Sequence, residues 1–151
     1  MRVGPSAAGA RVEPSGEPGC PVPRAIRSFH IGQKGWPDIA YNFLIDRHGG
    51  VWEGRAGSLG GPVRGDPTGG NRGCSQAGVL IGDFTAQPPT EEAQRSLVRT
   101  LAWLAEGYEI DTRPAATLEF TSRGSNRWPE GTVVTTTPTA GHRDIPHRLP
   151  G

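Results

Sequence analysis

The chain has 151 residues, and its 16 Lys and Arg residues against 15 Asp and Glu residues leave a formal net charge of +1. This length fits one compact domain, and the near-neutral charge argues against nucleic acid or an anionic membrane surface as a partner. Glycine (23) and proline (15) make up about a quarter of the chain, which at so low a net charge favours a loop-rich folded domain over disorder.

The start of the chain carries no recognisable structural pattern. Residues 1–20 contain Gly, Pro, Ser and Ala without an apolar period, so we expect a flexible lead-in to a domain over residues 21–151. The lead-in lacks the apolar core of a signal peptide, and no window reaches the about 18 consecutive apolar residues of a membrane span. Cys20 and Cys74 are compatible with one disulfide or with two free thiols.

A short helix opens the predicted domain. Prolines at its start, followed by Val22, Ile26 and Phe29 at helical spacing, predict an amphipathic helix that ends at Gly32. This helix brings His30 close to its end.

A β-hairpin is predicted next. A run of β-formers from Ile39 to Ile45 and a second run at Val51–Glu53 are separated by turn residues, which is typical of a hairpin. Tyr41 and Phe43 should share one face of the hairpin with Ile45, because alternate strand residues point the same way.

The middle of the chain predicts a loop, a strand and a helix. Residues 53–74 form a long Gly-rich loop, and loops of this length in small domains are usually functional or disordered. Ala77–Phe84 contains a continuous apolar run, so we expect a strand buried on both faces. Thr90 caps a helix from Glu91 to Gly107 that carries an apolar stripe.

Two short β-type runs, Thr117–Phe120 and Thr132–Thr137, complete the predicted elements. Strands thus alternate with helices. The predicted fold class is α/β or α+β, with a mixed central β-sheet flanked by helices.

Three side chains suggest chemistry by residue type. His142 and His147 flank a short stretch and could both contribute to a zinc site, which needs three or four N, S or O ligands. Their spacing alone fits solvated surface histidines better. Tyr41 is typical of a packed aromatic residue, although a tyrosine hydroxyl beside a metal-bound water can position that water or stabilise an oxyanion.

Several strings, taken in order, resemble the peptidoglycan recognition protein family, also known as type 2 N-acetylmuramoyl-L-alanine amidases. They are GWPDIAYNFLID, GGVWEGRAG, NRGCSQAGVLIGDF, TSRGSNRWPEGT and GHRDI. The resemblance covers residues 21–151 and points to the bacterial branch of the family. It implies a groove that binds the glycan and stem peptide of peptidoglycan, a monomer, and action in the cell wall or outside the cell.

The resemblance also implies an activity. Active members use one zinc ion to hydrolyse the amide bond between the muramyl lactyl group and L-alanine. By motif, Tyr41 matches the assisting tyrosine, and His142 of GHRD matches a zinc ligand. His147 is the only nearby side chain that could replace the family's cysteine ligand.

The implied substrate-binding residues match the family more fully. His30 matches a groove histidine that contacts the muramyl peptide. Gly35, Trp36 and Arg55 match the positions that distinguish stem peptides, in a combination that resembles members preferring meso-diaminopimelate. A fixed guanidinium suits the extra carboxylate of that residue. Trp36 is equally compatible with core packing, and Arg55 by residue type alone is a solvated loop cation.

The chain departs from the family pattern at several positions. It has no histidine before His30, where the family carries its first zinc ligand, and Leu149 stands in place of the ligand cysteine. Asp66 falls where relatives have a groove histidine, and Asn71 either contacts ligand or only holds its turn. The family's first strand and last helix are expected to be missing.

Three interpretations follow from this pattern. The first is a zinc amidase whose metal ligation relies on His142 and His147. The second is a peptidoglycan-binding module without catalysis, which keeps the groove after losing two ligands. The third is an incomplete reading frame, in which a histidine-bearing string and a secretion signal lie upstream of Met1.

Overall fold

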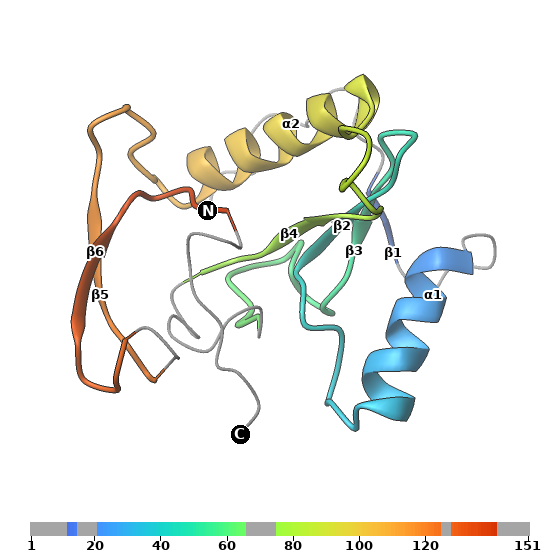
Figure 1. Ribbon diagram of the computed structural model, residues 1–151, viewed down its shortest axis with the longest axis horizontal. Helices are drawn as coiled ribbons and strands as arrows, with labels where there is room; N and C mark the ends of the chain where they lie inside the picture. The colour runs from blue at the N-terminus through green and yellow to red at the C-terminus, as the bar shows by residue number, and fades with distance from the viewer. Residues whose placement is uncertain (1–11, 15–20, 66–74, 125–127, 142–151) are drawn as a thin grey trace.

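The computed structural model describes residues 12–14, 21–65, 75–124 and 128–141. A four-stranded sheet lies at its centre, with α2 (Glu91–Gly107) on one side and α1 (Pro21–Ser28) on the side away from it (Figure 1). The central β2–β3 pairing is antiparallel and the outer pairings β1–β3 and β2–β4 are parallel. The strands, in spatial order, are β1 (Val12–Pro14), β3 (Val51–Glu53), β2 (Phe43–Ile45) and β4 (Gly78–Leu80). The predicted mixed sheet flanked by helices is confirmed.

Strand β1 lies inside the segment that we expected to carry no regular element. Val12–Pro14 pairs in parallel with Val51–Glu53. The edge of β3 offers unpaired main-chain N–H and C=O groups to a neighbouring segment, so pairing rather than an apolar period defines this strand. The local pattern of residues 1–20 therefore could not reveal it.

The helix predicted to run to Gly32 changes type before it ends. It continues beyond α1 as a π-helical turn over Phe29–Gln33, closed by the Lys34 N–H donating to the Phe29 carbonyl at 3.0 Å. The wider turn breaks the 3.6-residue period on which the prediction relied. Phe29 is consequently 43% exposed, and His30, at 7%, is the buried residue.

The predicted hairpin is confirmed, with strands β2 and β3 shorter than the β-type runs. Its turn is held by the Asp46 carboxylate. One oxygen accepts the N–H groups of His48 at 2.8 Å and Gly50 at 2.9 Å, and the other accepts the Trp52 indole N–H at 3.0 Å. Asp46 thus satisfies three donors at once and fixes the register of the two strands.

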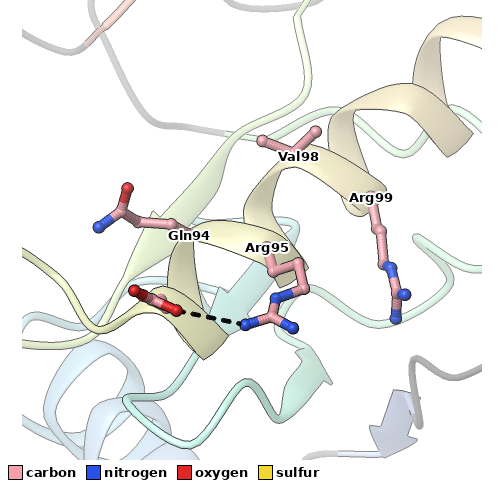
Figure 2. A pocket seen from close by; sticks show the side chains of 5 residues that line it. Gln94, Arg95, Val98 and Arg99 are labelled. Carbon is pink, nitrogen blue, oxygen red and sulfur yellow. Dashed lines mark ion pairs between the residues drawn. The ribbon is translucent and has the colours of Figure 1, made fainter.

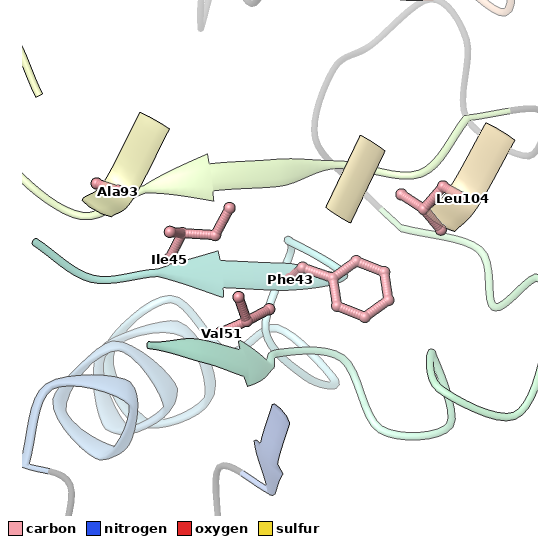
Figure 3. Packing of buried hydrophobic residues seen from close by; sticks show 5 residues of the cluster. All are labelled: Phe43, Ile45, Val51, Ala93 and Leu104. Carbon is pink, nitrogen blue, oxygen red and sulfur yellow. The ribbon is translucent and has the colours of Figure 1, made fainter. Parts of the chain in front are cut away.

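The core lies between the sheet and α2. Figure 3 shows Phe43 and Ile45 from β2 and Val51 from β3 facing Ala93 and Leu104 of α2. The helix begins after Thr90, whose hydroxyl accepts the Ala93 N–H at 3.3 Å, and ends at Gly107, both as predicted. The alternation on which the shared face of Tyr41 and Phe43 was predicted holds only within a strand, and β2 begins at Phe43. Tyr41 lies outside this core and has its ring near that of His30, so the prediction is wrong.

Strand β4 is half-buried, not buried on both faces as predicted. Within the described ranges it pairs only with β2, and α2 covers one of its faces. Val79, Leu80 and Ile81 are accordingly all of intermediate exposure. An apolar run signals burial, but it does not tell how many neighbours a strand has.

The predicted strands in the last part of the chain form a separate hairpin, β5 (Leu118–Thr121) with β6 (Val133–Thr136). It lies at the opposite end of the molecule from α1 (Figure 1). Phe120 and Val134 are directly paired and both buried, and Trp128 packs edge-on against Phe120 with ring centroids 6.0 Å apart. None of the helices in the described part of the chain is long and apolar enough to cross a membrane.

Candidate functional site

Three of the predicted site residues meet in one aromatic cluster. The His30 ring lies 4.7 Å from the Trp36 ring and 6.0 Å from the Tyr41 ring, centroid to centroid. His30 is buried, Tyr41 is half-buried and Trp36 is 39% exposed. The cluster therefore has a buried base and an open aromatic edge, which is a surface on which a ligand can stack.

The local chain path explains this convergence. Gly35 adopts a φ of +66°, a left-handed conformation that favours glycine and reverses the chain directly after the π-helical turn. The Trp36 N–H then donates to the His30 carbonyl at 2.9 Å, so the Trp36 side chain folds back over the imidazole. Gly35 thus has a conformational role that is independent of any contact with ligand.

The cluster holds a neutral histidine. Burial lowers the pKa of His30 below its ordinary value of 6.5, and the nearby Lys34 ammonium lowers it further. Its Nδ1 accepts the Ala40 N–H at 3.4 Å. A neutral imidazole whose Nδ1 accepts carries its proton on Nε2, which is then the donor that it can offer to a ligand.

Arg55 is brought beside the cluster by main-chain hydrogen bonds. Its N–H donates to the Tyr41 carbonyl at 2.9 Å, and the next N–H, of Ala56, donates to the Asp38 carboxylate at 2.9 Å. The other Asp38 oxygen accepts the Ile39 N–H at 2.8 Å. Asp38 therefore ties the segment that carries Trp36 to the segment that carries Arg55.

Among the described residues, no acidic side chain competes with an anionic ligand for the Arg55 guanidinium. The Arg55 side chain is half-buried, and no carboxylate of the described ranges forms an ion pair with its guanidinium. An arginine whose main chain is anchored beside an aromatic cluster, together with an imidazole N–H donor and a phenol, suits a ligand with apolar surface, hydrogen-bond acceptors and a carboxylate.

The remaining predicted site residues lie outside the described residues. They are Asp66, Asn71, His142 and His147. Within the described ranges, no group of three or more His, Cys, Asp or Glu side chains is placed to hold a metal ion. The zinc interpretation thus stays a prediction.

Sequence reasoning missed several residues that build the site. The sequence pattern does not single out Asp38, whose carboxylate accepts the Ala56 N–H. It does not single out Asn42, Ser58 or Gly54 either, although Asn42 is hydrogen-bonded to the other two and Ser58 also bonds to Arg55. Asn42 did carry a usable signal, because it is a single amide inside the apolar run IAYNFLI, and a buried amide needs hydrogen-bond partners. Ser58 and Gly54 depend on contacts with distant residues that no local pattern encodes.

A second surface feature lies on the outer face of α2. Figure 2 shows an open depression lined by Gln94, Arg95, Val98 and Arg99, together with Glu91, which forms an ion pair with Arg95 at 3.7 Å. It shares no residue with the aromatic cluster. Its lining comes from one helix and offers a single exposed apolar side chain, so the aromatic cluster is the better candidate site.

The comparisons with known proteins all point to one family. Residues 16–151 match the family model described as N-acetylmuramoyl-L-alanine amidase. Peptidoglycan recognition protein 1 of Rattus norvegicus is 34% identical over 94 residues, 58% of this chain and 49% of that protein. Peptidoglycan-recognition protein LE of Drosophila melanogaster is 37% identical over 89 residues, 59% of this chain and 25% of that protein.

Solved structures agree. Peptidoglycan recognition protein LE in complex with tracheal cytotoxin, a monomeric diaminopimelic acid-type peptidoglycan, superposes with a TM-score of 0.54 at 36% identity, covering 60% of this chain and 51% of that chain. A human recognition protein in complex with glycosamyl muramyl pentapeptide superposes with a TM-score of 0.51 at 26% identity. The match covers 67% of this chain and 63% of that chain. The chain spans about half the length of the first of these relatives. The match over residues 16–151 shows that the chain belongs to the N-acetylmuramoyl-L-alanine amidase family, which includes the peptidoglycan recognition proteins.

Proposed function

We propose that this chain binds the muramyl-peptide part of peptidoglycan on the aromatic cluster and Arg55. The observation that carries the proposal is the meeting of His30, Trp36 and Tyr41 beside a main-chain-anchored arginine. The likeness to a recognition protein in complex with a diaminopimelic acid-type fragment supports it.

Each group has a distinct part in this binding. The exposed face of Trp36 provides apolar contact, and the His30 Nε2–H donates a hydrogen bond to a carbonyl or hydroxyl of the ligand. The Arg55 guanidinium pairs with the side-chain carboxylate that diaminopimelate has and lysine lacks. Diaminopimelate-type stems are therefore the preferred ligands.

The test is the affinity for two matched ligands. Calorimetric titration of a diaminopimelate-type and a lysine-type muramyl tripeptide should show a preference of about tenfold or more for the first, because a hydrogen bond to a charged group contributes about 1.5 to 3 kcal/mol. Arg55→Ala should abolish this preference. Arg64→Ala, which removes an exposed cation from the same loop, should leave it intact.

Two results would contradict the proposal. One is a wild-type protein that binds neither tripeptide. The other is an Arg55→Ala variant that keeps the full preference while remaining folded.

A second candidate function is hydrolysis of the N-acetylmuramoyl-L-alanine amide bond, which the family membership favours. Zinc, when bound, polarises the carbonyl and activates water in such enzymes, and His142 and His147 are the residues that we propose as ligands. Tyr41 would supply its hydroxyl as a hydrogen-bond donor to the developing oxyanion.

Tyr41→Phe separates catalysis from binding. Only the hydroxyl is lost and the ring stays in the aromatic cluster, so the variant should keep most of its muropeptide affinity but release far fewer L-alanine-ended peptides from peptidoglycan at saturating zinc. An unchanged rate of release would remove Tyr41 from the mechanism. Absence of release by the wild-type chain would leave binding as the function.

A further inference from the structure

A buried hydrogen-bond network lies under the loop that carries Arg55. Asn42 and Ser58 are both 0% exposed. The Asn42 amide donates to the Ser58 hydroxyl at 3.0 Å and to the Val63 carbonyl at 2.9 Å, and its oxygen accepts the Ala77 N–H at 2.9 Å. Every polar group of the Asn42 side chain is satisfied, so the network is well determined.

The network ends on Arg55. The Ser58 hydroxyl donates to the Arg55 carbonyl at 2.7 Å, and the Ser58 N–H donates to the same carbonyl at 3.2 Å. On the other side, the Arg55 N–H donates to the Tyr41 carbonyl at 2.9 Å. Both main-chain polar groups of Arg55 are thus fixed, one by the segment of the aromatic cluster and one by Ser58.

We propose that Ser58, oriented by Asn42, is a positioning residue that determines how well Arg55 discriminates between stem peptides with and without an extra carboxylate. This inference rests on the proposed function. A guanidinium on a long flexible side chain gains specificity only when its origin is fixed, because a bidentate pair with a carboxylate requires a narrow geometry. The Ser58 hydroxyl fixes that origin without touching the ligand.

The alternative is that the network only stabilises the fold. Both roles predict that loss of the Ser58 hydroxyl lowers the free energy of unfolding, so stability cannot separate them. The two roles are separated by the ratio of the affinities for diaminopimelate-type and lysine-type muramyl tripeptides. A purely structural loss weakens both ligands alike, whereas a displaced Arg55 weakens only the first.

The chain offers a matched control at Ser122, which is 1% exposed. Its hydroxyl donates to the Trp128 carbonyl at 2.9 Å and accepts the Gly124 N–H at 3.2 Å. Ser122→Ala therefore removes an equally buried, equally hydrogen-bonded hydroxyl from the β5–β6 hairpin. Because Ser122 takes no part in the Arg55 network, the affinity ratio should not change.

The expected result is specific to Ser58. Ser58→Ala should lower the affinity ratio about three- to tenfold, the fold-change that corresponds to one hydrogen bond. In an Arg55→Ala background, Ser58→Ala should have no further effect on the ratio, because the two residues act through one contact. Amide hydrogen exchange at Arg55 should be faster in Ser58→Ala than in the wild type.

Each other outcome has a definite meaning. An unchanged ratio in folded Ser58→Ala, with Arg55→Ala still abolishing the preference, overturns this inference and leaves the proposed function standing. A wild-type protein without preference overturns both. If Ser58→Ala does not fold, Ser58→Cys keeps a side chain of similar shape with a weak donor and should lower the ratio by a smaller factor; an unchanged ratio there overturns the inference as well.

Discussion

Gly54 is the position where a single methyl group should disrupt the site most severely. It is buried at the end of β3, and its N–H donates to the Asn42 carbonyl at 2.9 Å. A Cβ added there would lie closer than 3.0 Å to the Tyr41 carbonyl oxygen and 3.3 Å from the Tyr41 carbonyl carbon. These are main-chain atoms, so no side-chain rotation can relieve the overlap.

The cost of Gly54→Ala follows from these contacts. Overpacking costs about 1 to 3 kcal/mol, and displacement of the Tyr41 carbonyl also weakens its hydrogen bond from the Arg55 N–H, which contributes about 1 kcal/mol. We therefore expect a loss of about 3 kcal/mol in the free energy of unfolding, a large part of the about 5 to 15 kcal/mol that a domain has. Affinity for diaminopimelate-type muropeptide should fall with it.

Urea unfolding followed by tryptophan fluorescence measures this loss. The control is Gly61→Ala in the same loop, where an added Cβ meets no atom within 4 Å, so its cost should stay below about 0.5 kcal/mol. Equal stabilities of the two variants would refute the reasoning, because it would mean that the Tyr41 and Gly54 main chains do not approach as closely as described.

Two predictions concern pH. Because folding lowers the pKa of His30 below 6.5, the unfolded chain binds this proton more readily, so the free energy of unfolding should fall as the pH drops from above 6.5 toward the folded-state pKa. His30→Gln should remove that part of the slope in urea unfolding between about pH 7.5 and about pH 5, and identical slopes would contradict the burial of the imidazole. Burial raises the pKa of Asp46, but hydrogen bonds from Trp52, Gly50 and His48 together bring it below 3.8. The ionised Asp46 carboxylate thus adds to the free energy of unfolding above pH 3.8, and this contribution is lost as the pH falls through the folded-state pKa. Asp46→Asn should lower the free energy of unfolding by about 1 to 3 kcal/mol near neutral pH and flatten its dependence on pH in the acid range. An unchanged acid dependence would argue against these hydrogen bonds.

The parts of the fold that depend on local pattern could be predicted from the sequence. Helix α2 begins after Thr90 and ends at Gly107 as the cap, the apolar stripe and the stop residue indicate. The burial of β4 and the existence of β1 could not be predicted, because both depend on which strand lies alongside. The π-helical turn at Phe29–Gln33 was missed because it departs from the period that defines a helix in sequence.

The candidate site divides in the same way. His30, Trp36 and Arg55 were identified through a resemblance in sequence strings, and the structure brings His30 and Trp36 into contact and Arg55 next to Tyr41. The residues that hold them were not identified, because Asp38 reaches the Arg55 segment across 18 positions of sequence. Side-chain hydrogen bonds between distant segments have no periodic signature in sequence.

The most direct test of the account is a map of the ligand on the protein. In an NMR titration with a diaminopimelate-type muramyl tripeptide, we predict shifts at the Trp36 indole N–H and at the main-chain N–H groups of Arg55 and Ala56. The Trp128 indole of the β5–β6 hairpin and the Val98 amide of α2 should not move. Shifts confined to the hairpin or to α2, or no shifts at all, would contradict the claim that the aromatic cluster and Arg55 form the peptidoglycan-binding site.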